Sequence, residues 1–223
     1  MSFQIAIDGP AGAGKSTIAR KVAEELGFLY IDTGAMYRAM GLYALDRGID
    51  PADVDAVNEA LPGIDVDLTA EDGALRVLLQ GEDVSERIRT EEVSMAASKI
   101  SAHRAVREKL VHRQQEIAGV RDVVMDGRDI GTVVLTEAPL KVFLTASAKT
   151  RANRRVLDLI GRGESPDPEE VLRDIVARDQ QDMNRAESPL RQAKDAVFLD
   201  SSDLSIDEVT SRILELVRER RGH

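Results

Sequence analysis

The sequence predicts an α/β fold, in which helices cover both faces of a parallel β-sheet. Short apolar stretches that suit buried strands alternate with longer stretches of helical periodicity. Glycines and prolines separate the two kinds of stretch. The 223 residues could form one α/β domain with an insert or two small domains. We take residues 1–223 as a single domain.

The elements can be assigned in chain order from these patterns. The predicted strands of the sheet are residues 3–8, 28–31, 123–125, 140–144 and 196–199. The first predicted helix has Ile18, Val22 and Leu26 at a spacing of four and stops at Gly27. A second helix runs from after Gly34 to about Gly48, and Pro51 could open a third. The later predicted helices are residues 90–119 with a cap at Thr90 and a break near His103, residues 147–161, residues 168–184, and a closing helix whose capping box is Ser205 and Glu208. Strands that alternate with helices in this way favour a parallel sheet.

Two segments differ from this core and are predicted to be inserts. Residues 64–84 alternate in hydrophobicity around a Glu71-Asp72-Gly73 turn, which predicts a β-hairpin with a third short strand near 84–88. We assign residues 60–105 to this hairpin-containing insert. Gly161, Gly163 and the Ser-Pro-Asp-Pro stretch that follows predict a flexible break, and residues 150–166 are the second insert.

Charge and composition exclude several classes of protein. The net charge is −10, and residues 46–92 account for it with 14 acidic and 4 basic side chains, so the rest of the chain is neutral overall. No basic stretch suits nucleic acid, no apolar run could span a bilayer, and the first residues do not have the pattern of a signal peptide. The absence of cysteine excludes disulfides and thiolate metal sites. We expect a cytoplasmic monomer with neither nucleic acid nor membrane as a partner.

A phosphate-binding loop follows the first predicted strand. Residues 9–16, GPAGAGKS, have the P-loop spacing and lie between a strand and a helix, as the motif requires. Glycines let successive backbone N–H groups face an anion, and the helix directs the positive end of its dipole at the phosphates. The predicted ATP-binding residues of this loop are Gly9, Pro10, Ala11, Gly12, Ala13, Gly14, Lys15, Ser16 and Thr17. Lys15 would supply a mobile cation near the transferred group, and the Ser16 hydroxyl would be a ligand of Mg²⁺.

The rest of the chain favours a kinase over the other P-loop proteins. It has no Asn-Lys-x-Asp motif that would read guanine, and its strand at Val123 does not end in Asp-Glu. Arginines lie close to the glycine breaks, where fixed guanidinium groups could bring two phosphates together. Arg178, Asp182 and Arg185 have the spacing of one helix face, although an isolated ion pair on a solvated face has the same spacing.

Four motifs follow one another along the chain: DGPAGAGKST (residues 8–17), DTGAMYR (32–38), GRDIGTVV (127–134) and RDQQDMNRAESPL (178–190). In this order they resemble the bacterial cytidylate kinases, a family of P-loop nucleoside monophosphate kinases. The resemblance spans essentially the whole chain and includes the hairpin insert that distinguishes this family. It implies a P-loop kinase core, with residues 60–105 as the region that binds the monophosphate and residues 150–166 as a short lid.

The resemblance also implies the substrates and residue roles. The reaction would be phosphorylation of CMP and dCMP by ATP with Mg²⁺, giving CDP and dCDP. Arg38, Arg128 and Arg185 would hold the acceptor phosphate, Ser98, Arg107 and Asp129 would read cytosine, and Asp182 with Arg178 would contact the pentose. Thr33 stands where the family often has serine, which keeps the hydroxyl donor. The catalytic residues would be Lys15, Arg128 and Arg185.

Some roles remain open on the residues alone. Asp129 could accept from the cytosine amino group, or it could be a structural carboxylate after a strand. Arg151, Arg154 and Arg155 share one helical edge. They could be solvated, or they could belong to a lid that closes and brings arginines onto the ATP phosphates. Of the three, we predict that Arg154 binds ATP. His103 and His112 have no companion metal ligands and are expected to do no chemistry. The rival functions are a kinase for UMP, AMP or shikimate and a nucleotide-binding regulatory module.

Overall fold

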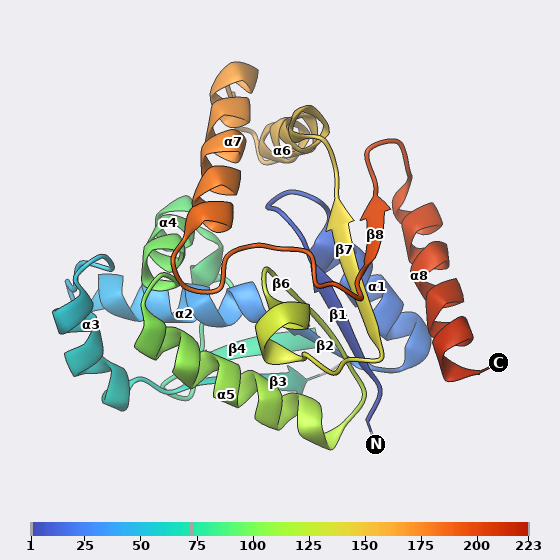
Figure 1. Ribbon diagram of the computed structural model, residues 1–223. Helices are drawn as coiled ribbons and strands as arrows, with labels where there is room; N and C mark the ends of the chain where they lie inside the picture. Colours follow the sequence, from blue (N-terminus) through green and yellow to red (C-terminus); the bar gives the residue numbers. More distant parts are fainter. Residues whose placement is uncertain (1, 72–73, 223) are drawn as a thin grey trace. The chain divides into compact units, whose positions relative to one another are not determined.

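The computed structural model describes residues 2–71 and 74–222 and divides into two compact units. Unit 1 comprises Met1–Tyr30 and Val120–His223, and unit 2 comprises Ile31–Gly119. Figure 1 labels most of their helices and strands. The predicted single domain thus contains two contact units that alternate along the chain.

Unit 1 is built on a five-stranded sheet with the strand order β2-β6-β1-β7-β8. Its strands are β1 (Gln4–Asp8), β6 (Val123–Gly127), β7 (Leu140–Thr145) and β8 (Val197–Asp200), and β2 (Leu29–Asp32) continues into unit 2. Its helices are α1 (Lys15–Leu26), the π-helix η3 (Ile130–Val134), α6 (Ala148–Gly161), α7 (Pro168–Asn184) and α8 (Ile206–Arg221). The α/β class is therefore confirmed.

The register of the central strands determines which motifs become neighbours. β1 pairs in parallel with β6, so Asp8 lies opposite Gly127. β1 also pairs in parallel with β7, and β7 with β8. The carboxyl ends of parallel strands meet at one edge of a sheet, which is where ligands bind in open α/β sheets. The phosphate loop after β1 and the Gly127-Arg128-Asp129 motif, which begins at the last residue of β6, therefore lie beside each other.

Unit 2 is helical around a small antiparallel sheet. Its elements are α2 (Thr33–Asp46), α3 (Val54–Ala60), η1 (Leu61–Gly63), β3 (Val66–Glu71), β4 (Ala74–Leu79), β5 (Glu82–Asp83), η2 (Arg87–Arg89), α4 (Glu91–Ile100) and α5 (Arg104–Val120). The strand order is β3-β4-β5, so the predicted hairpin is confirmed, although its turn residues 72–73 lie outside the described residues. Helix α2 supplies Met36 and Met40 to a core shared with the sheet and with α4 and α5. Gly41 lets α2 approach α4 closely, because a Cβ at Gly41 would lie 2.8 Å from the amide nitrogen of Ala97.

Several local predictions were wrong, each for an identifiable reason. Helix α2 begins at Thr33, because the Asp32 side chain caps it by accepting from the N–H of Ala35. Asp53 caps α3, so Pro51 does not open that helix. The third short strand is Glu82–Asp83, and the region near 84–88 leads into the 3₁₀-helix η2. The π-helix η3 after β6 was not predicted, because its five residues are too few to show a periodic pattern in the sequence.

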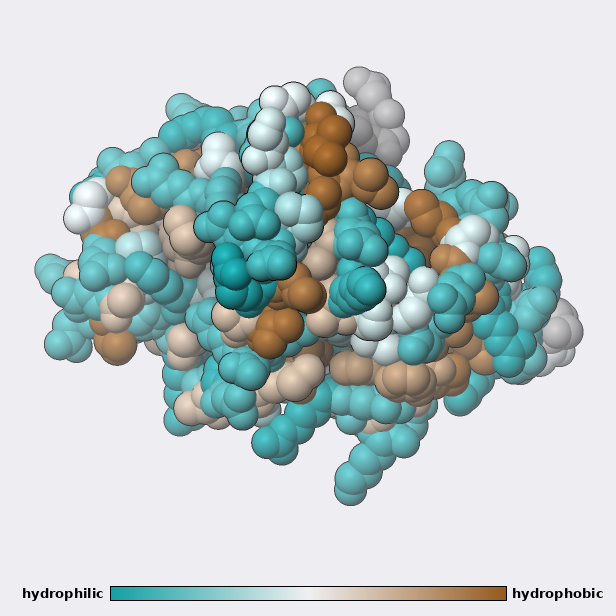
Figure 2. All heavy atoms as spheres, turned by 90° about the horizontal axis from the view of Figure 1, so that it is seen from above, coloured by the Kyte–Doolittle hydropathy of each residue, from teal (hydrophilic) through white to brown (hydrophobic). Residues whose placement is uncertain are grey.

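Other local predictions are confirmed. Thr90 caps α4 through its hydroxyl, the helical stretch breaks between Ile100 and Arg104, and Ser205 with Glu208 forms the capping box of α8. The surface view in Figure 2 shows mostly hydrophilic residues with small hydrophobic groups among them. Within residues 2–71 and 74–222, no helix is long and apolar enough to cross a membrane.

Candidate active site

The phosphate loop has the backbone shape that an anion site needs. Gly14 is the N-cap of α1 in the left-handed conformation (φ 87°), and among the described residues no side chain caps the helix. The first N–H groups of α1 are therefore available to a ligand at the positive end of the helix dipole. Gly9 is required by space, since a Cβ there would lie 1.9 Å from the carbonyl oxygen of Leu144 on β7. The loop is thus held against the sheet by its first residue.

Lys15 is buried at the base of this loop. Its Nζ donates to the carbonyl oxygen of Pro10 at 2.8 Å. Burial, followed by the nearby positive charge of Arg128, lowers the pKa of Lys15 to about 7, although Asp126 and other carboxylates oppose the shift. A triphosphate in the loop would favour the charged form of this amine.

The pKa of Lys15 predicts a pH dependence of ATP binding. With a pKa of about 7, roughly nine-tenths of the amine would be neutral at pH 8, and a bound triphosphate would restore the proton. We therefore expect proton uptake on ATP binding at pH 8 and an affinity that falls as the pH rises above 7. Calorimetric titration in two buffers of different ionisation enthalpy measures this uptake. Equal heats in both buffers for the wild-type protein would contradict the prediction.

Ser16 faces a carboxylate that the sequence reading did not assign. The exposed Ser16 hydroxyl donates to Oδ2 of Asp126 at 2.9 Å, and the Tyr30 hydroxyl donates to Oδ1 of Asp126 at 3.0 Å. Asp126 is the one charged residue of the buried strand β6 and lies next to its last residue, Gly127. A carboxylate near the carboxyl end of a buried strand is the sequence signal that could have identified it. A hydroxyl and a carboxylate are oxygen ligands of the kind that Mg²⁺ prefers beside phosphates. The residues present therefore fit the predicted Mg²⁺ site.

Asp8 fixes the segment that carries Arg128 and Asp129. Its two carboxylate oxygens accept from the N–H groups of Ile130 and Gly131, both at 2.7 Å. Burial raises the pKa of Asp8 to about 6, with a further contribution from Asp129, while the two backbone donors lower it. The first turn of η3 is thus anchored to the residue just before the phosphate loop.

The predicted acceptor residues of unit 1 form two ion pairs. Arg128 Nε lies 2.7 Å from Oδ2 of Asp182, and an Nη of Arg185 lies 3.7 Å from Oδ1 of Asp129. Although burial raises the pKa of Asp182, the guanidinium groups of Arg128, Arg178 and Arg185 lower it below its ordinary value. These arginines concentrate positive charge around two buried carboxylates.

Arg185 lies just after helix α7, although its spacing from Arg178 and Asp182 predicted a shared helix face. Helix α7 ends at Asn184, and Arg185 is its C-cap with an extended backbone (φ −60°, ψ 143°). Its Nε donates to the carbonyl oxygen of Ser188 at 2.7 Å. Arg178, Asp182 and Arg185 therefore do not share one helix face, and the turn after α7 positions Arg185.

The remaining acceptor residues belong to unit 2. Thr33 and Arg38 lie on α2, where Arg38 pairs with Oδ2 of Asp32 at 2.8 Å. Ser98 lies on α4, and the buried Arg107 on α5 donates to the carbonyl oxygen of Ser101 at 3.3 Å. The Arg107 guanidinium also lies 5.5 Å from the centre of the Tyr37 ring.

The arginines of the predicted lid have defined partners. Arg154 donates to the carbonyl oxygen of Ser201 at 2.7 Å, and Arg151 is buried against Asp179. Nε2 of His103 donates to the carbonyl oxygen of Pro51 at 2.7 Å, and His112 pairs with Glu116. Within the described residues no group of three or more His, Cys, Asp or Glu side chains could hold a metal.

Together, the parallel sheet, the phosphate loop and the arginine cluster define a P-loop phosphotransferase. Residues 5–219 match the cytidylate kinase family. The chain is 54% identical over 214 residues to a cytidylate kinase of Caldicellulosiruptor bescii, with 96% of this chain and 95% of the relative covered. It is 48% identical over 219 residues to a cytidylate kinase of Lactobacillus johnsonii, with 98% and 95% covered. The chain belongs to the cytidylate kinase family.

Comparison with solved structures agrees on the fold. A gluconokinase from Sinorhizobium meliloti matches with a TM-score of 0.51 at 17% identity, and the match covers 99% of this chain and 94% of that one. At this identity the likeness supports the P-loop kinase-like fold and says nothing about the acceptor.

Proposed function

We propose that the protein transfers the γ-phosphoryl group of ATP to CMP and dCMP, producing ADP with CDP or dCDP. The observation that carries this proposal is the placement of Arg128 and Asp129 at the sheet edge beside the phosphate loop. The phosphate loop would hold a triphosphate, and the neighbouring segment with Arg128 would hold a second anion. Membership of the cytidylate kinase family supports cytidine monophosphates as that anion.

The donor half would bind ATP through backbone and side-chain groups of residues 9–17. The free N–H groups of the first turn of α1 would hold phosphate oxygens, and Lys15 would move from the Pro10 carbonyl to the transferred group. Ser16 and Asp126 would hold Mg²⁺, which neutralises phosphate charge when bound. Arg154 would add a further cation from α6.

The acceptor half would bind the monophosphate through arginines. Arg128 and Arg185 are held by carboxylates and would present guanidinium groups to the acceptor phosphate together with Arg38. The proposed cytosine contacts are Ser98, Arg107 and Asp129, and the proposed pentose contacts are Asp182 and Arg178. The Thr33 hydroxyl would add a donor to the same ligand.

The reaction needs no dedicated general base in this scheme. The attacking oxygen of a nucleoside monophosphate is already anionic, so the protein supplies position and charge neutralisation. Water would compete as an acceptor, and we propose that residues 60–105 and the lid 150–166 close to exclude it before transfer.

A coupled assay of ADP release tests the substrate assignment. Activity should be highest with CMP and dCMP in a series that also contains UMP, AMP, GMP and shikimate. Preference for any other acceptor would refute the assignment. ATP hydrolysis that no acceptor stimulates would favour the rival regulatory module.

Replacing Arg185 with alanine separates the two halves of the site. We expect KM for CMP to rise and kcat to fall, together by roughly 100-fold or more in kcat/KM, because one phosphate-binding cation is lost. Binding of ATP, measured by calorimetry, should change little. Arg191→Ala is a suitable control, since Arg191 is exposed just beyond the same turn. Loss of ATP affinity with unchanged CMP affinity would show that Arg185 does not serve the acceptor.

A further inference from the structure

Arg151, in the first turn of α6, is hydrogen-bonded to the phosphate loop. One of its Nη atoms donates to the carbonyl oxygen of Ala11 at 2.9 Å, and its Nε donates to the carbonyl of Ala146 at 2.9 Å. Its Cβ would lie 3.4 Å from a Cβ added at Gly12. Only 5% of the Arg151 side chain is exposed, so its positive charge is stabilised by these protein partners and not by water.

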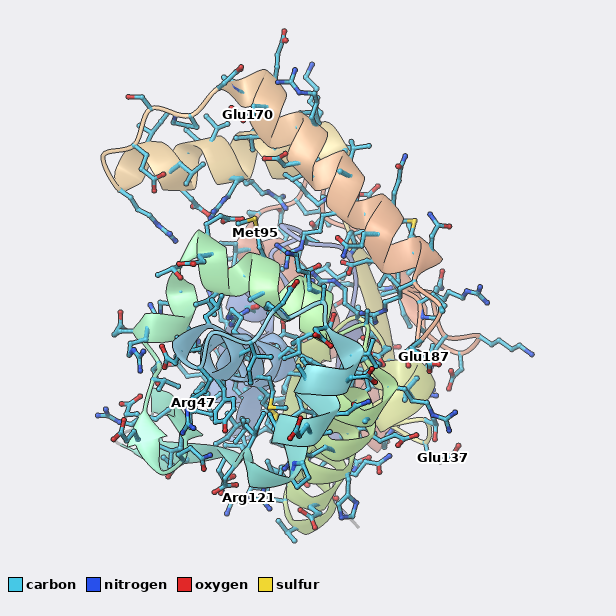
Figure 3. All side chains as sticks on the ribbon, turned by 90° about the vertical axis from the view of Figure 1, so that its left-hand side faces the viewer. Arg47, Met95, Arg121, Glu137, Glu170 and Glu187 are labelled. Atoms are coloured by element: carbon cyan, nitrogen blue, oxygen red, sulfur yellow. The ribbon has the colours of Figure 1, made fainter. Side chains whose placement is uncertain are left out.

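The same guanidinium also holds helix α7. Its two Nη atoms pair with the two carboxylate oxygens of Asp179, at 2.9 and 2.5 Å. Helices α6 and α7 lie side by side, and the label of Glu170 marks α7 in Figure 3. The Asp179 side chain is 13% exposed and therefore differs from the solvated acids of that helix.

Asp179 lies between two of the proposed acceptor residues, Arg178 and Asp182, along α7. It directly follows Arg178 and precedes Asp182 by three residues, so it lies about one helical turn from the carboxylate that holds Arg128. Arg151 thus connects the carbonyl of the donor loop to the helix that carries acceptor groups. A planar guanidinium can make both connections at once, whereas the single ammonium group of lysine cannot reproduce this fork.

We propose that Arg151 and Asp179 are positioning residues that set the distance between the phosphate loop and α7, and so align the two phosphates for transfer. The inference rests on the proposed function and deepens it. Arg151 also lies near the start of the proposed lid, where its hydrogen bonds hold it in place. Arg154 and Arg155 follow it along the chain within that lid. Neither Arg151 nor Asp179 contacts a reacting atom in this scheme.

Kinetics of Asp179→Asn and Arg151→Lys test the proposal at a temperature well below the melting point of each variant. We expect kcat to fall by roughly 10-fold to 100-fold, as small misplacements of reacting groups do, while KM for ATP and for CMP stays within about threefold. The double variant should be no slower than the slower single variant, because both changes break one connection. Asp179→Glu, which retains the carboxylate, should recover part of kcat.

Two controls distinguish positioning from stability. Asp174→Asn makes the same chemical change at an exposed residue of α7 and should keep wild-type kcat. Ile213→Val removes a methylene from a fully buried residue of α8 and should lower the melting temperature without lowering kcat. If Asp179→Asn does not fold, Arg151→Lys, which keeps the charge, decides the question.

The possible failures can be told apart. Wild-type kcat in folded Asp179→Asn or Arg151→Lys, with only a lower melting temperature, would show a purely structural ion pair and overturn the inference. A raised KM with unchanged kcat would also overturn it. If the wild-type protein and Asp174→Asn both fail to phosphorylate CMP, the proposed function fails, and the positioning role falls with it.

Discussion

Replacement of Lys15 by methionine should reduce kcat about 1000-fold, the upper range for loss of one transition-state donor. Methionine has a similar length and is apolar, so the buried space remains filled while the cation is lost. Because burial already disfavours the charged amine and lowers its pKa, the fold should lose little stability. Steady-state kinetics with CMP and a thermal melt of the same preparation measure the two quantities.

Lys21→Met provides the matched control for this change. Lys21 lies on the same helix, has a side chain that is 41% exposed, and pairs with Asp207. It should retain wild-type kcat, since a surface ion pair contributes little and touches no phosphate. Proton uptake on ATP binding at pH 8 should also disappear in Lys15→Met and persist in Lys21→Met. A Lys15→Met enzyme with more than about a tenth of wild-type kcat would remove Lys15 from the catalytic residues.

The second large effect is expected from Gly9→Ala. The new methyl group would meet the Leu144 carbonyl oxygen at 1.9 Å, and this oxygen belongs to the backbone of a central strand. Relief requires the phosphate loop to move or the pairing of β1 with β7 to open. We expect a loss of about 4 kcal/mol or more in the free energy of unfolding, among the largest effects of single substitutions. ATP binding should be lost in whatever fraction remains folded.

Gly27→Ala separates the collision from the conformational preference of glycine. Gly27 is left-handed (φ 68°) at the end of α1, but a Cβ there would have no atom within 4 Å. We expect this variant to lose only about 1 kcal/mol. Urea denaturation of both variants gives the comparison. Equal losses would show that contact with Leu144 is not what requires glycine at position 9.

The local elements follow from the sequence to the extent that local contacts define them. Helix α7 was predicted with its observed bounds because Asp167 and Pro168 begin it and apolar residues recur along it. The hairpin of unit 2 was predicted because its alternation is a property of adjacent residues. Helix starts at Thr33 and Val54 were misplaced where an aspartate competed with a glycine or a proline as the boundary signal.

The candidate site shows the same division. Residues 9–17 were identified from the sequence because the phosphate loop is a contiguous motif whose spacing expresses its backbone geometry. The chemical content of the arginine and aspartate motifs was also visible, and family resemblance supplied the roles proposed for them. Only the tertiary structure placed Asp126 against Ser16, Asp8 beneath η3 and Asp179 on Arg151.

The physical reason is the separation of these partners along the chain. Ser16 and Asp126 are 110 positions apart, and Asp8 and Ile130 are 122 apart. Periodicity and capping report only on residues within a few turns of each other, whereas these pairs depend on the order and register of strands β1, β6 and β7. The sequence by itself therefore determined the phosphate loop and the α/β class. The tertiary structure decided which carboxylates contact that loop and the segment after β6, and it placed Arg185 in the turn that follows α7.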